Sequence, residues 1–194
     1  CSSDLLAQLI ERRAEFLADY QNENYAATYR DFMARVIARE KEALGSSGEF
    51  SAAVARSLFK LMAYKDEYEV ARLHNGAAFR RQLGAMFDGD VKLSYHLAPP
   101  LLARRDPVTG VPRKIALGSW MRPVFRGLAA LKFLRGTPFD PFGRTAERRM
   151  ERGLIYDYGL TIERILPILS PNNYAAATAL ARLPLEIKGD RKST

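Results

Sequence analysis

Histidine, cysteine and serine side chains are the first places to look for catalysis or metal binding, and this sequence offers few candidates. The chain of 194 residues has two histidines, His74 and His96, and one cysteine, Cys1. Metal sites combine several His, Cys or carboxylate ligands at short spacings, and neither histidine has such neighbours. No serine lies in the strand–turn–helix string of a hydrolase nucleophile. We therefore predict no catalytic or metal-binding residue, and expect His96 to be a hydrogen-bonded structural residue.

A diphosphate-binding site is the second kind of chemistry to consider. Asp88-Gly89-Asp90 and Asn172-Asn173 contain the residue types that hold a divalent ion on thiamine diphosphate. That site uses Gly-Asp-Gly with Asn-Asn a short distance beyond, whereas here the order is inverted and the second string begins 82 positions after Asp90. Neither the glycine pattern of a P-loop nor that of a dinucleotide fold is present. The sequence thus predicts no cofactor-binding residue.

Positive charge is concentrated in the middle third of the chain. The net charge is +8, and between Val91 and Arg152 thirteen cations oppose four acids, which gives +9 there and −1 elsewhere. Such a region can bind nucleic acid, a phosphate-bearing ligand or an acidic protein, or it can be a solvated face. The candidate interaction residues are Arg104, Arg105, Arg144, Arg148 and Arg149.

Two unusually dense strings of charged and aromatic residues stand out. The first, Tyr64–Leu73, alternates charges with two tyrosines in one helical stretch. Within it, Glu69 and Arg72 lie three positions apart, which predicts an ion pair along one helix face.

The second string, Leu134–Met150, carries two phenylalanines in a loop framed by proline and aspartate, followed by an arginine-rich helix start. We expect Phe139 and Phe142 each to bury a ring against that helix. Cations in a first turn oppose the helix dipole. The arginines at 144, 148 and 149 are therefore expected to meet partners, namely Asp140, Glu147 or a ligand.

Together with Tyr95–Pro107, these strings closely resemble the C-terminal region of indolepyruvate ferredoxin oxidoreductases of the long, fused bacterial type. The resemblance is strong from about Leu58 to Tyr158. It implies a parent enzyme that oxidatively decarboxylates an aryl 2-oxo acid to its acyl-CoA and passes electrons to ferredoxin. The family does so with thiamine diphosphate, magnesium and 4Fe-4S clusters.

The resemblance carries no catalytic residue onto this chain. It therefore implies a non-catalytic C-terminal accessory domain of a cytoplasmic enzyme, inactive as an isolated piece. Its partners would be the rest of the parent enzyme, packed against it or across a dimer interface, and ferredoxin.

Two other readings stay open. One is a free-standing basic helical module that binds nucleic acid or an acidic protein. Against nucleic acid, the aromatics lie mostly at core spacing and are not interleaved with Lys and Arg as stacking platforms. The other is a small stand-alone enzyme, which the lack of a recognisable site disfavours.

Composition favours a globular chain rather than a membrane protein. Hydrophobic residues make up 47% of the chain and the mean hydropathy is −0.22. The longest charge-free stretch, Ile165–Ala181, contains two prolines and is shorter than the roughly 20 residues of a bilayer span. One cysteine suits a reducing, cytoplasmic setting. With no initiator Met and no signal peptide, we expect a single helical domain, 1–194, excised from a larger protein.

Hydrophobic periodicity predicts the elements that hold these residues. The pattern is typical of a mainly α fold, with about seven helices in an irregular bundle and one small β-hairpin. The predicted helices span about 4–20, 23–44, 50–74, 76–87, 119–134, 145–165 and 171–183. The hairpin is predicted from the alternation at 91–96 and a return strand at 113–117.

Overall fold

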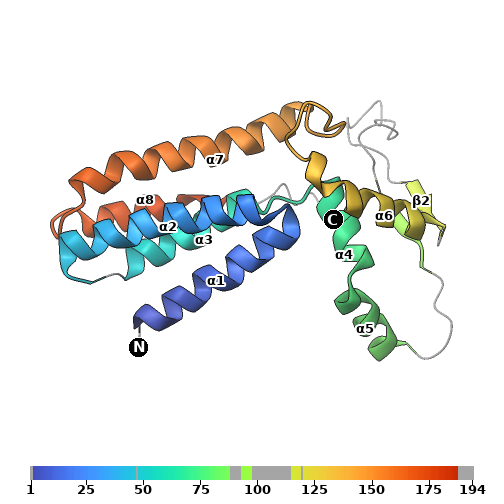
Figure 1. Cartoon of the computed structure of the whole chain (residues 1–194), viewed down its shortest axis with the longest axis horizontal. Coiled ribbons are helices and arrows are strands. Elements are labelled where there is room, and N and C mark those ends of the chain that lie inside the picture. The colour runs from blue at the N-terminus through green and yellow to red at the C-terminus, as the bar shows by residue number, and fades with distance from the viewer. Residues whose placement is uncertain (1, 47, 88–92, 98–114, 119, 188–194) are drawn as a thin grey trace. The chain divides into compact units, whose positions relative to one another are not determined.

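The computed structural model describes residues 2–46, 48–87, 93–97, 115–118 and 120–187 (Figure 1). These residues form eight α-helices, two short 3₁₀ helices and one antiparallel pair of strands, so the mainly α fold is confirmed. None of these helices is long and apolar enough to cross a bilayer. The chain divides into two compact units, unit 1 (1–64 and 145–194) and unit 2 (65–144). The expectation of a single domain stays a prediction.

Unit 1 is a bundle built around one central helix. Its helices are α1 (Ser2–Tyr20), α2 (Glu23–Leu44), α3 (Glu49–Met62), α7 (Ala146–Ile165) and α8 (Tyr174–Glu186). Helix α3 packs against the other four (Figure 1), and apolar or small side chains on most of its sides allow this. Its buried residues are Phe50, Ser51, Ala53, Val54, Ala55, Ser57, Leu58 and Met62.

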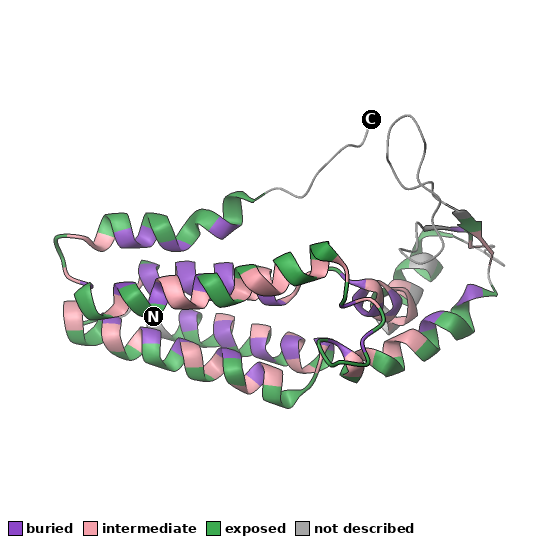
Figure 2. Ribbon diagram, turned by 90° about the horizontal axis from the view of Figure 1, so that it is seen from above, coloured by how far each residue is buried: buried purple, intermediate pink, exposed green. Residues whose placement is uncertain are grey.

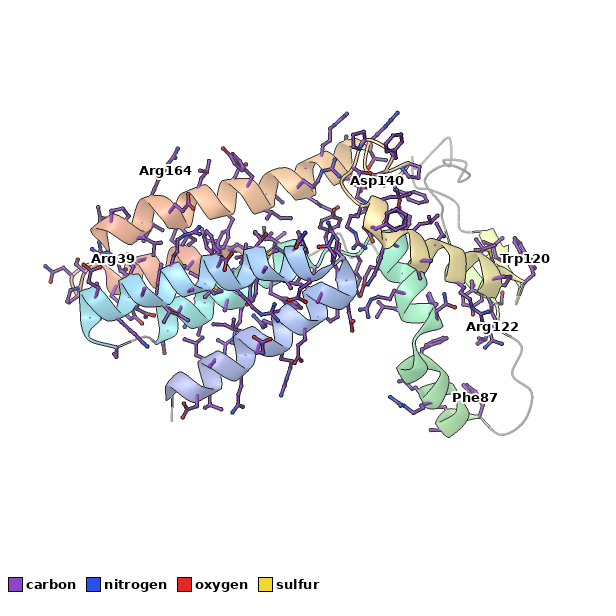
Figure 3. The ribbon with its side chains drawn as sticks, viewed as in Figure 1. Arg39, Phe87, Trp120, Arg122, Asp140 and Arg164 are labelled. Atoms are coloured by element: carbon purple, nitrogen blue, oxygen red, sulfur yellow. The ribbon has the colours of Figure 1, made fainter. Side chains whose placement is uncertain are left out.

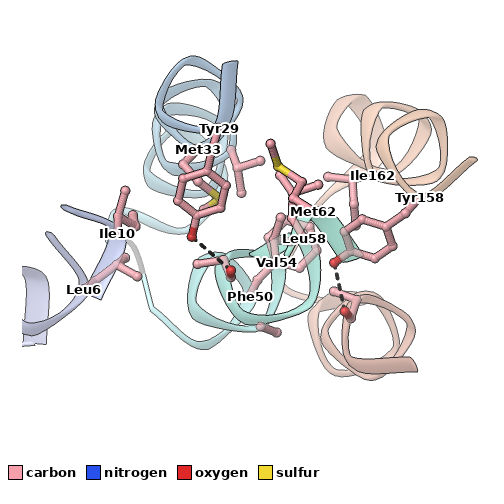
Figure 4. Close-up of a cluster of buried hydrophobic side chains, with 14 of the residues drawn as sticks. Leu6, Ile10, Tyr29, Met33, Phe50, Val54, Leu58, Met62, Tyr158 and Ile162 are labelled. Atoms are coloured by element: carbon pink, nitrogen blue, oxygen red, sulfur yellow. Dashed lines mark hydrogen bonds between the residues drawn. The ribbon is translucent and has the colours of Figure 1, made fainter. Parts of the chain in front are cut away.

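Buried positions recur along the inward sides of the unit 1 helices (Figure 2). Three of the buried side chains in this core are tyrosines, and two of them, one on α2 and one on α7, are labelled in Figure 4. The hydroxyl of Tyr29 donates to the carbonyl of Ala55 at 2.9 Å, and that of Tyr158 donates to the carbonyl of Ala181 at 2.9 Å. Each ring therefore fills the core while its polar end is satisfied.

The predicted bounds of the second helix are confirmed by its caps. The Asn22 side chain accepts from the Tyr25 backbone N–H at 2.9 Å, which satisfies a free donor of the first turn. Gly45 ends the helix in the left-handed region, with φ 77°, where glycine carries no steric penalty.

The third predicted helix is wrong in its length, because it is two helices. Helix α3 ends at Met62, and α4 (Glu67–Asn75) begins after a break of four residues. The hydroxyls of Tyr20 and Tyr25 donate to the carbonyls of Tyr64 and Met62, at 2.8 and 3.1 Å. These bonds satisfy carbonyls that a continuous helix would pair internally, so α3 can stop there.

The last helix starts later and ends later than predicted. Residues 170–173 form a turn, in which Ser170 N–H donates to the Asn173 side chain at 2.9 Å, so α8 begins at Tyr174. The helix also continues past Pro184 to Glu186. There the Lys60 ammonium donates to the carbonyls of Pro184, Leu185 and Ile187 at 2.7–3.1 Å and caps the terminal turn.

Unit 2 has a much smaller apolar core. It contains α4, α5 (Ala77–Met86), β1 (Tyr95–Leu97), β2 (Ile115–Leu117), α6 (Met121–Ala130) and a 3₁₀ turn at Leu131–Leu134. The strands pair antiparallel with Tyr95 opposite Leu117, which confirms the hairpin. The buried apolar residues, within the described part of the unit, are mainly Ala71, Tyr95, Met121 and Phe125.

Candidate functional site

A buried ion pair of unit 2 joins the two strings singled out in the sequence. Asp66, from the first string, caps α4 by accepting from Glu69 N–H at 2.8 Å. Arg135, from the second, binds both carboxylate oxygens of Asp66, Nε to Oδ2 at 2.5 Å and Nη2 to Oδ1 at 2.8 Å. The two side chains are only 3% and 4% exposed. A bidentate pair at this depth is a strong, geometrically specific contact.

A second buried carboxylate, Asp140, organises the loop that follows Arg135 (Figure 3). Its Oδ2 accepts from the backbone N–H of Gly136 at 2.9 Å, and its Oδ1 accepts from that of Phe142 at 3.1 Å. Gly136 has φ 75°, a conformation that other residues rarely adopt. The loop thus folds around the Asp140 carboxylate. Its hydrogen bond to the backbone N–H two residues further on is typical of turns that contain aspartate.

Tyr68 links this loop to α4. Its hydroxyl donates to Asp140 Oδ1 at 3.1 Å, and the Phe142 ring meets its ring edge to face, with centroids 5.4 Å apart. Burial, together with the charge and hydrogen bond of Asp140, raises the pKa of Tyr68 well above its usual value, so the phenol stays protonated. The Arg135 guanidinium lies 5.6 Å from the centre of the same ring. We call Asp66, Tyr68, Arg135, Asp140 and Phe142 the buried joint.

Of the two phenylalanines predicted to be buried, Phe139 is 81% exposed, so that prediction is wrong. The turn in which Asp140 N–H donates to the Thr137 carbonyl brings the Asp140 side chain inward and leaves Phe139 at the outer side of the loop. Phe142 is half-buried and has its ring contact with Tyr68 of α4.

The buried joint is a network of hydrogen bonds and one ion pair that links α4 to the loop after Arg135. Its carboxylates accept hydrogen bonds from backbone, guanidinium and phenol donors, and the Asp66 and Asp140 side chains are shielded from solvent. Beside it, Arg72 binds both oxygens of the buried Glu69 at 2.8 and 2.9 Å, which confirms the predicted pair. Carboxylates and guanidinium groups that already bind protein partners are not placed to bind a substrate.

Three of the five predicted interaction arginines lie in the described part of the chain, Arg144 in unit 2 and Arg148 and Arg149 in unit 1. Arg104 and Arg105 lie outside the described residues. Arg144 is exposed and donates to the carbonyl of Pro138 at 2.8 Å, instead of to the predicted carboxylates.

Arg148 and Arg149 lie in the first turn of α7, in unit 1. Arg148 pairs with Glu151 at 2.5 Å and lies 5.6 Å from the centre of the Tyr64 ring. Arg149 is exposed, and no residue in the described part of the chain forms an ion pair with it. Thr145 caps the helix as its position predicts, by accepting from Arg148 N–H at 3.3 Å.

Comparison with known protein families finds a family model that matches nearly the whole chain. Residues 6–192 match the model of DUF6537, a family of unknown function. The chain belongs to this family. No curated protein and no solved structure matches it.

One buried charged residue of this DUF6537 chain was missed by sequence reasoning. Glu40, near the end of α2, is fully buried. Its carboxylate accepts from the N–H groups of Gly48 and Ser51 at 2.9 and 3.2 Å, from the Ser51 hydroxyl, and from the Tyr174 hydroxyl at 2.7 Å. The Tyr174 oxygen in turn accepts from Phe50 N–H at 3.1 Å. The free donors at the start of α3 are therefore satisfied by α2 and α8, an arrangement that one sequence alone does not signal.

His74 belongs to an aromatic cluster in unit 2. Its ring stacks on Phe125, with centroids 5.4 Å apart, and meets Tyr95 and Phe79 edge to face at 5.3 and 5.2 Å. Burial lowers the pKa of His74 below its usual value, which favours the neutral ring. Across the described residues, no group of three or more His, Cys, Asp or Glu could hold a metal ion. His96 pairs with Ala116 in the hairpin, and its predicted role stays a prediction.

Unit 1 also has a groove of about 260 Å³ between α2, α3 and α7, lined mostly by apolar side chains. Three of its polar members have partners within the unit: Tyr25 donates to the carbonyl of Met62, Thr28 donates to that of Asn24, and Glu163 pairs with Arg35 at 3.0 Å. Nothing in this lining points to a particular ligand chemistry.

Proposed function

We propose that this chain is a non-catalytic accessory domain of an indolepyruvate ferredoxin oxidoreductase. The parent enzyme would oxidatively decarboxylate an aryl 2-oxo acid to its acyl-CoA in the cytoplasm and pass the electrons to ferredoxin. The chain itself would contribute a folded surface for contacts with other proteins or other parts of the enzyme. It would contribute no group that takes part in the reaction.

One observation supports this role above the others. Two of the three strings that carry the resemblance supply the five residues of the buried joint, and most of these side chains are buried. Their unusual composition is thus accounted for by the folding of unit 2. An accessory domain needs this kind of residue, whereas a catalytic domain needs charged groups that face a substrate.

The cofactors of the parent enzyme do not fit this chain. A 4Fe-4S cluster is normally held by about four thiolates, and the chain has one cysteine. The strings that resembled a thiamine diphosphate site have the wrong order and spacing. On this proposal thiamine diphosphate, magnesium and the clusters are held by other parts of the parent enzyme, and no reaction step passes through these residues.

The reading frame around the chain tests the proposal. We expect it to encode, beside this chain, a Gly-Asp-Gly and Asn-Asn pair for thiamine diphosphate and cysteine motifs for 4Fe-4S clusters. The protein made from the whole frame should then reduce ferredoxin when given indolepyruvate and CoA. A frame that lacks both motifs, with no such activity, would overturn the proposal and leave the basic binding module as the better account.

A further inference from the structure

Helix α6 of unit 2 has apolar side chains on two different sides. Met121 and Phe125 face the small core and are 7% and 3% exposed. Trp120, Val124 and Leu131 form a second row, 61%, 41% and 41% exposed. Large apolar side chains grouped along an exposed helix are a mark of an interaction surface.

Unpaired positive charge accompanies this row. Arg122, labelled in Figure 3 beside Trp120, and Arg126, one helical turn further on, are exposed. Neither has an ion-pair partner among the described residues. From Asp106 to Asp140 the sequence contains no other acidic residue. Unit 2 as a whole has fourteen cations and seven acids, so it carries +7 of the net +8.

The two rows flank a strip of small side chains on the outward side of the helix. At about 100° per residue, Pro123, Gly127 and Ala130 lie between the tryptophan row and the arginine row. A Cβ atom added at Gly127 would meet nothing within 4 Å. A partner can therefore approach the helix closely here, with apolar contacts on one side and cations on the other.

We propose that Trp120, Arg122, Val124, Arg126 and Leu131, the α6 face, form a docking surface for an acidic protein. The choice of partner rests on the proposed function, which requires an acidic iron–sulfur protein as electron acceptor. Aromatic residues and arginine are the types that dominate the energy of protein interfaces. Complementary charge speeds and orients such an encounter.

This chemistry favours a protein over a nucleic acid or a lipid surface. Nucleic acid binding relies on a series of cations along the phosphate backbone, whereas α6 offers two free arginines beside a mostly apolar row. A helix that lies on a membrane buries its apolar face in the lipid, whereas Met121 and Phe125 of α6 already face the core of unit 2.

Gly127 allows a test with little risk to the fold, because a Cβ atom added there meets nothing within 4 Å and glutamate, lysine and alanine are all better helix formers than glycine. Trp120, the chain's one tryptophan, reports binding directly, since the iron–sulfur cluster of a tryptophan-free bacterial ferredoxin would quench its fluorescence. The probes are this ferredoxin, single-stranded DNA and anionic phospholipid vesicles. The chain is compared with Gly127→Glu, Gly127→Lys and Gly127→Ala, and with Ala179→Glu, an equal charge change on an exposed position of α8 in unit 1.

We expect ferredoxin to bind the unchanged chain and Gly127→Glu to weaken that binding about tenfold or more in about 0.1 M salt, because like charges would meet in the interface. Gly127→Lys should bind ferredoxin at least as tightly as the unchanged chain does. The affinities of the two control variants, Gly127→Ala and Ala179→Glu, should stay within about twofold of that of the unchanged chain. In about 1 M salt the differences should shrink.

Absence of ferredoxin binding, equal losses in Gly127→Glu and Ala179→Glu, or tighter binding of DNA or vesicles than of ferredoxin would each overturn the docking proposal. None of these results bears on the reading frame around the chain. The docking surface and the accessory function can therefore fail independently.

Discussion

Asp66 and Arg135 are the residues on which unit 2 most depends. They lie 69 positions apart in the chain and meet in a bidentate ion pair that is almost fully buried. The apolar core around them is small, and besides this pair the buried Tyr68, through its contacts with Asp140 and Phe142, holds α4 against the loop after Arg135. Removing one member of a buried pair is costly because the other charge is left without compensation.

A double-mutant cycle measures this dependence. Arg135→Met should lower the free energy of unfolding of unit 2 by about 3 to 5 kcal/mol, because Asp66 would then be buried alone. Asp66→Asn keeps a good helix cap but should be destabilising for the same reason. The double variant should cost at least about 1 kcal/mol less than the sum of the two. Urea unfolding followed by Trp120 fluorescence gives these values, and strictly additive losses would show that the pair does not stabilise the unit.

His74 should make the stability of unit 2 depend on pH. Its pKa is lowered in the folded chain, so the unfolded chain binds the proton more tightly. The stabilising contribution is therefore complete above the unfolded pKa of about 6.5 and is lost as the pH falls through the lower folded value. His74→Phe keeps an aromatic ring in the cluster and removes the proton site. Between about pH 7 and pH 5, the variant should lose less stability than the unchanged chain, and equal losses would rule out His74 as the cause.

Among the elements, α3 depends most on contacts from outside itself. Its N-cap is Gly48, which has no side chain to accept a hydrogen bond from the first turn. The first-turn donors are instead satisfied by Glu40 of α2 and Tyr174 of α8. A carboxylate at a helix N-terminus also interacts favourably with the helix dipole. One buried side chain thus fixes the start of the helix that packs against all the others in unit 1.

Two substitutions on α2 distinguish the loss of the Glu40 hydrogen bonds from the loss of one negative charge on the same helix. Glu40→Gln should lower the stability of unit 1 by about 2 kcal/mol, because an amide brings a donor toward groups that are donors themselves. Glu42→Gln, whose carboxylate is 73% exposed and pairs with Arg39, should cost less than about 0.5 kcal/mol. Thermal unfolding followed by far-UV circular dichroism compares the two. Equal losses would mean that the Glu40 hydrogen bonds do not stabilise the bundle.

Element types were predictable from the sequence where periodicity and end signals agree. The second helix was placed correctly because its apolar spacing ends at a glycine-rich turn. The break before α4 was missed because the apolar stripe runs on through it, and the tyrosines that satisfy the broken turn come from other helices. The start of α8 was missed because proline after serine signals a helix start equally well as a turn.

The candidate site was less predictable than the fold. The two strings were recognisable by composition, but which side chains pair depends on distances that only the folded chain sets. Asp66 meets Arg135 rather than a neighbour on its own helix, and Phe139 points outward so that Asp140 can turn inward. Arg144 donates to a carbonyl, a partner that carries no signal in the sequence.

At the scale of the whole molecule, charge and packing divide between the two units. Unit 1 holds most of the apolar core and has sixteen cations against fifteen acids, whereas unit 2 has a small core and nearly all of the net positive charge. This division fits an accessory domain in which one unit provides the stable bundle and the other carries the exposed, basic α6 face.

The proposed non-catalytic role is tested most directly by a turnover assay of the isolated, folded chain. The chain is first shown to be helical by circular dichroism and is then supplied with thiamine diphosphate, magnesium, CoA, indolepyruvate and ferredoxin, with a complete indolepyruvate ferredoxin oxidoreductase as positive control. We predict no reduction of ferredoxin above the rate without protein, and no iron–sulfur absorption after reconstitution with iron and sulfide. Indolepyruvate-dependent reduction of ferredoxin by this chain alone would contradict the account.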